Sequence, residues 1–258
     1  MNMKTITVFF LTFAILSCHN SARGDRELSL LGFESPPSGI IATLEAKNAP
    51  GFREHFMLGQ AYKKEKQYRK ALYHFANSCF SQHRTGELKL FPSTVFQYAD
   101  GFHIKSPFFS DAMFEIADIY YLYREYQHVA RFVDLMPPDR SALYRDAVIL
   151  KARALTENGK HSEAIESLEK ALPRFDAPVS RALLLIRLGS THKRASHADR
   201  ALGCFIDACA TDAPSWATDI AAGEALSIMD GRIPALSSRQ KFTLSRALYI
   251  SRKFDAAL

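Results

Sequence analysis

Glycine, proline and cysteine are scarce in this sequence: its 258 residues include 12 glycines, 11 prolines and 4 cysteines. The glycines and prolines stand mostly between segments of regular apolar periodicity. Those segments are rich in leucine, alanine, tyrosine and phenylalanine, which favours packed helices. Widely spaced cysteines exclude a disulfide framework and a zinc site, because both need short paired spacings. A chain that is 47% apolar and 23% charged is expected to fold, and we expect an all-α fold.

Concentrated positive charge and catalytic motifs are also missing. The formal net charge is +6, but the basic residues are spread out, so no nucleic-acid partner is expected. The sequence contains no glycine-rich phosphate loop, no His-Glu-x-x-His zinc motif and no Gly-x-Ser-x-Gly elbow. We therefore expect no enzyme activity, no metal ion and no cofactor. His74 and His192 are expected to pack between helices, and Glu115, Asp118 and Glu157 to lie on solvated faces.

The N-terminal residues differ in composition from the rest of the chain. Met1–Lys4 is short and positively charged, and Ile6–Leu16 is an apolar run of eleven residues, the length of a secretory signal and too short to span a bilayer. The run ends in Ile15-Leu16-Ser17-Cys18, which resembles the lipobox of bacterial lipoprotein signals. The resemblance implies a signal peptide at 1–17 and attachment of fatty acyl chains such as palmitate to Cys18. The alternative is a plain secretory signal or a buried cysteine.

Such an anchor would hold the protein at a bacterial cell membrane or outer membrane, facing the periplasm, because three acyl chains bind a bilayer almost permanently. The polar and turn-prone residues 18–38 predict a flexible tether between the anchor and the folded part.

A helical-hairpin motif occurs near the start of the folded part. Small residues stand where two helix backbones would approach, and large residues stand where they would fill the surrounding space. The markers are Leu58, Gly59 and Tyr62 on a first helix and Ala71, Phe75 and Ser78 on a second. This motif resembles the tetratricopeptide repeat, a two-helix unit of 34 residues. The resemblance implies a right-handed α-solenoid of helical hairpins over residues 39–258.

The motif recurs, with units expected near 52–84, 111–138, 145–178, 182–215 and 238–258. Leu188-Gly189 reproduces Leu58-Gly59, and Leu155 follows Tyr121 by 34 residues. The last unit is incomplete, so we expect either a partner that covers the open end or a longer parent protein. Between Gly86 and Pro107 the periodicity lapses, and the aromatic residues there either pack on neighbouring hairpins or present a binding edge.

The resemblance also implies a concave surface lined by the first helix of each unit. The residues expected to form a ligand groove there are Arg53, Phe56, Gln60, Lys63 and Lys64 of the first unit, Arg153 of the third, and Lys193 and Arg194 of the fourth. Both Leu-Gly units place a basic pair at the rim, so an extended acidic peptide or anionic polymer would suit the groove by charge. The alternative is that these side chains only keep the helices soluble.

These features predict a membrane-anchored periplasmic lipoprotein that acts as an interaction scaffold for other cell-envelope proteins, close to peptidoglycan. The alternative is the N-terminal helical part of a truncated or split lytic murein transglycosylase, because soluble members of that enzyme family carry a helical superhelix before the catalytic domain. Their glutamate-serine catalytic motif is not found in this chain. A subunit of an outer-membrane assembly or solute-capture complex is a third hypothesis.

Overall fold

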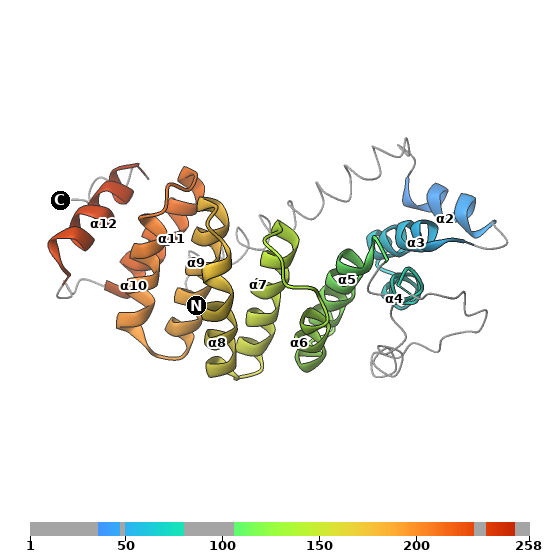
Figure 1. The fold of residues 1–258 in the computed structure, drawn as a ribbon, viewed down its shortest axis with the longest axis horizontal. Helices are drawn as coiled ribbons and strands as arrows, with labels where there is room; N and C mark the ends of the chain where they lie inside the picture. Colours follow the sequence, from blue (N-terminus) through green and yellow to red (C-terminus); the bar gives the residue numbers. More distant parts are fainter. Residues whose placement is uncertain (1–35, 47–49, 80–105, 230–235, 251–258) are drawn as a thin grey trace. The chain divides into compact units, whose positions relative to one another are not determined.

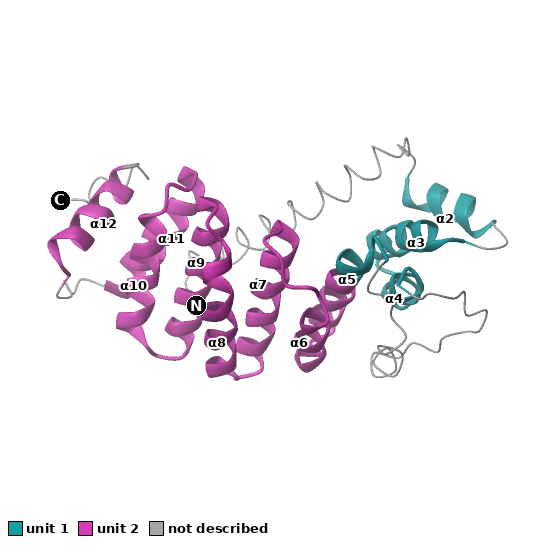
Figure 2. Cartoon of the chain, viewed as in Figure 1, with its two compact units in different colours: residues 1–112 teal, residues 113–258 magenta. Residues whose placement is uncertain are grey.

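The computed structural model describes residues 36–46, 50–79, 106–229 and 236–250, and these residues form helices and connecting turns with no strand among them (Figure 1). The expected all-α class is confirmed. The chain divides into two compact units, residues 1–112 and 113–258, and helix α5 contributes to both (Figure 2). The predicted signal peptide and Cys18 lie outside the described residues.

The first unit contains α2 (Pro37–Glu45), α3 (Phe52–Lys64), α4 (Tyr68–Asn77) and the first residues of α5 (Phe109–Leu122). Proline favours the first position of a helix because its φ is fixed and its missing N–H would have no helical partner there. Helix α2 therefore begins at Pro37, inside the segment predicted to be a tether. Helix α3 packs against both α2 and α4, and the Tyr62 hydroxyl donates a hydrogen bond to Glu45 at the end of α2.

The second unit continues with a regular series of helices. They are α6 (Tyr126–Asp134), α7 (Ala142–Glu157), α8 (His161–Ala171), α9 (Pro178–Arg194), α10 (Ala198–Cys209), α11 (Ser215–Met229) and α12 (Ser238–Ile250), with a 3-10 turn at Leu172–Arg174. Helix α6 ends shortly before Pro137, a residue that cannot continue a helix. Ser141 caps α7, because its Oγ accepts a hydrogen bond of 3.0 Å from the Tyr144 N–H.

Neighbouring helices of the second unit pack in chain order. Helix α9 packs on α8 and also on α7, and α11 packs on α10 and also on α9. Figure 1 shows α7 to α10 lying side by side. Helix α12 packs on α11 and α10. The unit predicted at 238–258 begins at the first residue of α12, and its residues 251–258 lie outside the described residues.

The helix pairs share one turn geometry. Each pair is joined by three residues, of which the middle one has a left-handed conformation: Lys66 (φ 58°), Arg124 (φ 62°), Gly159 (φ 77°) and Ser196 (φ 63°). In each turn the next N–H bonds to the carbonyl five residues earlier, at 2.8 to 3.0 Å, which satisfies an otherwise unpaired helix-end carbonyl. In the turn Asn158-Gly159-Lys160 the left-handed position is filled by glycine, the residue that adopts this conformation most readily. Equal turns give the hairpins α3–α4, α5–α6, α7–α8 and α9–α10 the same local construction.

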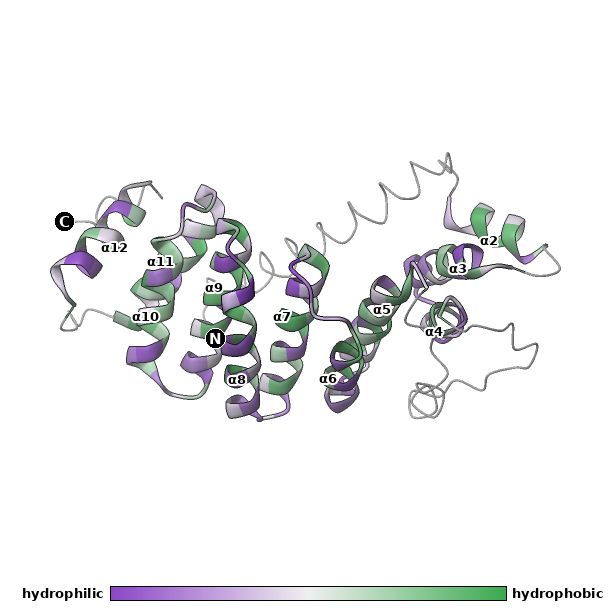
Figure 3. Ribbon diagram, viewed as in Figure 1, coloured by the Kyte–Doolittle hydropathy of each residue, from purple (hydrophilic) through white to green (hydrophobic). Residues whose placement is uncertain are grey.

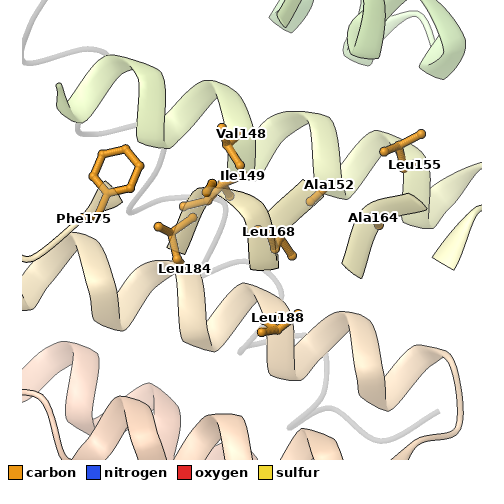
Figure 4. Close-up of a cluster of buried hydrophobic side chains, with 10 residues drawn as sticks. Val148, Ile149, Ala152, Leu155, Ala164, Leu168, Phe175, Leu184 and Leu188 are labelled. Carbon is orange, nitrogen blue, oxygen red and sulfur yellow. The ribbon is translucent and has the colours of Figure 1, made fainter. Parts of the chain in front are cut away.

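One hydrophobic core cluster of the second unit lies between α7, α8 and α9. Small side chains of this cluster let the helices approach, and branched or aromatic ones fill the space between them (Figure 4). The cluster comprises Val148, Ile149, Ala152, Leu155, Ala164, Leu168, Ala171, Phe175, Leu184 and Leu188. Burial of each large member contributes about 1.5–3 kcal/mol relative to exposure. Hydrophobic and hydrophilic residues alternate around these helices, as Figure 3 shows, so one face of each helix is available for this core.

The two Leu-Gly motifs are sites of close helix approach, as the sequence predicts. A Cβ atom added to Gly59 would lie 2.6 Å from the Phe75 ring, and one added to Gly189 would lie 2.8 Å from the Phe205 ring. No side chain larger than hydrogen fits there without movement of the ring. In both hairpins the aromatic side chain of the second helix therefore rests directly on the backbone of the first.

Candidate anion-binding site

The predicted groove residues of the first unit do not share one environment. Phe56 is only 4% exposed, and its ring stacks on Phe108 with 5.1 Å between the ring centroids. It is therefore a core residue, which corrects the expectation that it lines a ligand groove. Arg53 and Lys64 are exposed, and Gln60 and Lys63 are half-buried.

In the second unit, two of the predicted residues bind neighbouring helices. Lys193 donates hydrogen bonds to Glu224 at 2.9 Å and to Ser227 at 2.8 Å, both on α11. Arg194 on α9 forms a bidentate ion pair with Glu157 on α7, in which Nη2 lies 3.1 Å from Oε2. Hydrogen bonding to Glu157 raises the pKa of Arg194. Glu157 thus serves as the counter-ion of Arg194, beyond the solvated role expected from the sequence.

The remaining predicted residue, Arg153 on α7, lies against an aromatic ring. Its guanidinium carbon is 4.8 Å from the centre of the Tyr121 ring, a cation–π distance. Arg153 is half-buried, and no carboxylate forms an ion pair with it in the part of the chain that the structure describes. The Arg153 guanidinium thus lies over the Tyr121 ring, and its N–H groups are donors that can bind an anion.

Arg187 on α9 completes this group of charges. The residue as a whole is half-buried, but its Nε atom is fully buried and has no hydrogen-bond partner among the described residues. Burial lowers the pKa of Arg187 to about 9; the positive charges of Arg153 and Arg194 lower it further, while Tyr121 and Glu157 oppose the shift. A buried donor without an acceptor is costly, so this arginine is held in an unfavourable state.

We call Arg153, Arg187, Arg194, Glu157 and Tyr121 the arginine cluster. Three guanidinium groups and one carboxylate give it a formal charge of +2. The carboxylate is already bound by Arg194, so the uncompensated charge belongs to Arg153 and Arg187. Guanidinium edges in a partly desolvated place bind oxyanions well, which makes this cluster a candidate anion-binding site.

Arg187 is not among the groove residues predicted from the sequence, although one feature of the sequence indicates it. The residue interrupts the apolar run Ala182–Leu188, where an unpaired charge would be unfavourable. The resemblance to the tetratricopeptide repeat marks other positions of the first helix, and Arg153 and Arg194 stand at such positions. Only the packing of α9 on α7 shows that the three arginines belong together.

Histidines form two close pairs within hairpins, and both expected histidines are buried. His55 and His74 approach with 3.0 Å between their Nδ1 atoms, and His192 and His197 with 3.4 Å. The His74 ring also stacks on the Tyr62 ring. Glu115 and Asp118 on α5, expected on solvated faces, are half-buried.

Within the described ranges, no group of three or more histidine, cysteine, aspartate or glutamate side chains is placed to hold a metal ion. No helix in the same part of the chain has both the length and the apolar character needed to cross a membrane. No protein-family model matches the sequence, and no curated protein matches it.

Proposed function

We propose that the protein is a membrane-anchored, periplasm-facing lipoprotein whose hairpins form a right-handed, tetratricopeptide-like α-solenoid and act as a protein-interaction scaffold. Three features support the solenoid: the common three-residue turn, the repeated contact of glycine with phenylalanine, and the packing of α9 and α11 on both helices of the preceding pair. The lipobox-like sequence before Cys18 supports the anchor.

The observation that carries the interaction role is the presence, on α7 and α9, of two arginines that have no counter-ion among the described residues. The fold compensates Arg194 with Glu157 and Lys193 with Glu224, but it gives Arg153 and Arg187 no carboxylate within the described residues. These helices are the first helices of their hairpins, which in the proposed solenoid form the binding face. An acidic segment of a partner would supply the missing charge.

Site-specific photo-crosslinking in bacterial membranes tests the scaffold. A photoreactive residue at Ser190, half-buried on the first helix α9, is compared with one at Lys170, exposed on the second helix α8. We expect a discrete adduct from position 190 only, and its loss when Arg187→Gln is added. Equal adducts from both positions, or none from position 190, would contradict a scaffold that binds through its first helices.

A further inference from the structure

The arginine cluster also constrains the charge of its ligand. A carboxylate or a phosphodiester carries one negative charge and would leave the cluster, whose formal charge is +2, with an excess of +1. A phosphate monoester carries close to two negative charges near neutral pH and would balance it. Charge balance matters more here than on an open surface, because the Arg187 Nε atom is removed from water.

The donors are also of the kind that suits phosphate. Arg153 and Arg187 come from adjacent helices, α7 and α9, so an anion between them would receive N–H groups from two directions. Arginine binds phosphate oxygens through paired N–H groups in a fixed plane, which lysine does not offer. The Arg153 guanidinium lies over the Tyr121 ring, which limits the space in which this side chain can move. Arg194 is already paired with Glu157 and adds a third guanidinium group to the cluster.

We propose that Arg153 and Arg187 bind a doubly charged phosphate group, either inorganic phosphate or a phosphate monoester carried by the partner. Phosphodiesters and single carboxylates should bind more weakly, because each carries only one negative charge. The inference deepens the proposed interaction role and rests on it for the source of an esterified phosphate, but the binding of the phosphate group can be measured on the purified protein alone.

Calorimetric titration of the full chain in detergent, with inorganic phosphate, methyl phosphate, dimethyl phosphate and acetate as probes, tests this inference. We expect inorganic phosphate or methyl phosphate to bind at least about tenfold more tightly than dimethyl phosphate and acetate. One hydrogen bond between charged groups contributes about this factor to an affinity. Tighter binding of methyl phosphate identifies an esterified group as the ligand, and tighter binding of inorganic phosphate identifies the free ion. Equal affinity for dimethyl phosphate would overturn the proposal.

Matched variants locate the site. Arg187→Lys keeps the charge but removes the planar donor set, and Arg153→Gln removes the half-buried partner; each should weaken phosphate binding by about tenfold or more. Arg200→Gln, at an exposed position on α10, is the control and should leave binding unchanged. If Arg187→Lys does not fold, Arg153→Gln still decides. Unchanged binding in a folded Arg153→Gln protein would overturn the assignment.

The two proposals fail differently. If no probe binds but position 190 still gives a specific adduct, the phosphate site is wrong and the scaffold stands. If phosphate binds but no adduct forms, the scaffold is wrong and the anion site stands.

Discussion

At the scale of single residues, the contact between a glycine and a phenylalanine sets the distance between the two helices of a hairpin. In a helix interior, glycine is normally less favourable than alanine by about 1 kcal/mol, because it loses more backbone entropy on folding. Gly59 and Gly189 reverse that preference, since a methyl group would collide with the ring of Phe75 or Phe205. The same fold offers Gly203 on α10, where an added Cβ atom would meet no atom within 4 Å.

We expect Gly189→Ala to lower the free energy of unfolding by about 1–3 kcal/mol, because the Phe205 ring must move within a packed core. Gly203→Ala, its matched control, should raise the free energy of unfolding by about 0.5–1 kcal/mol. Urea denaturation followed by circular dichroism measures both changes. A stabilising Gly189→Ala would show that the ring yields at no cost and that close approach does not fix this hairpin.

The residues of the candidate site were harder to predict than those of the hairpins. Leu58, Gly59 and Phe75 have counterparts at Leu188, Gly189 and Phe205, because the hairpins α3–α4 and α9–α10 share the same packing. An arginine at one point of α9 has no such repetition. The role of this arginine depends on the side chains of α7 and α5 that lie near it. The sequence likewise does not show that Phe56 is buried, and so the residue was assigned to a groove.

At the scale of helices, the pairing of α3 with α4 depends on a buried histidine that must stay neutral. His74 is 9% exposed, stacks on Tyr62, and contacts His55 through Nδ1. Burial lowers the pKa of His74 from 6.5 to about 3, and the positive charges of His55 and Lys70 add to the effect. The unfolded chain takes up a proton near pH 6.5, whereas the folded chain does so only near pH 3.

The free energy of unfolding should therefore fall as the pH decreases from about 6.5 to about 3. Protonation of His74 in the unfolded chain lowers it by up to about 1.4 kcal/mol per pH unit in this range. His74→Phe keeps an aromatic ring beside Tyr62 and removes the titrating group, so the loss of stability on acidification should become less steep. Chemical denaturation at several pH values gives the slope for both proteins. An identical slope in the variant would show that His74 does not control the acid response.

The helices themselves were largely predictable, with one informative exception. Helices α3, α4 and α7 to α10 have apolar periodicity and end at turns, and the structure places helices where the sequence suggests them. Helix α11 lies almost entirely between two of the predicted units, 182–215 and 238–258. Its buried residues are mostly alanines, Ala217, Ala221, Ala222 and Ala225, which carry no distinctive pattern. The role of such a helix is defined by contacts with α9, α10 and α12.

At the scale of the whole molecule, the proposed lipid anchor would determine which partners the hairpins can meet. Cys18 lies outside the described residues, so the prediction rests on the sequence Leu16-Ser17-Cys18 and the apolar run before it. An anchored protein would search only the molecules near one membrane surface, which raises its effective concentration toward them.

We expect labelled palmitate to enter the protein in growing bacteria, and Cys18→Ala to abolish the labelling and move the protein out of the membrane fraction. Cys204→Ala, which removes a half-buried thiol from α10, is the matched control and should leave both properties unchanged. Labelling that persists in Cys18→Ala would refute the anchor at this residue.

The common three-residue turn has a further consequence for where the chain can accept a change in length. The left-handed residues Lys66, Arg124, Gly159 and Ser196 follow one another at intervals of 58, 35 and 37 residues, while the turns themselves never vary in length. Each hairpin is thus closed internally, and additional sequence is accommodated between one hairpin and the next. We therefore expect a short insertion between two hairpins to be tolerated better than the same insertion within one of the three-residue turns.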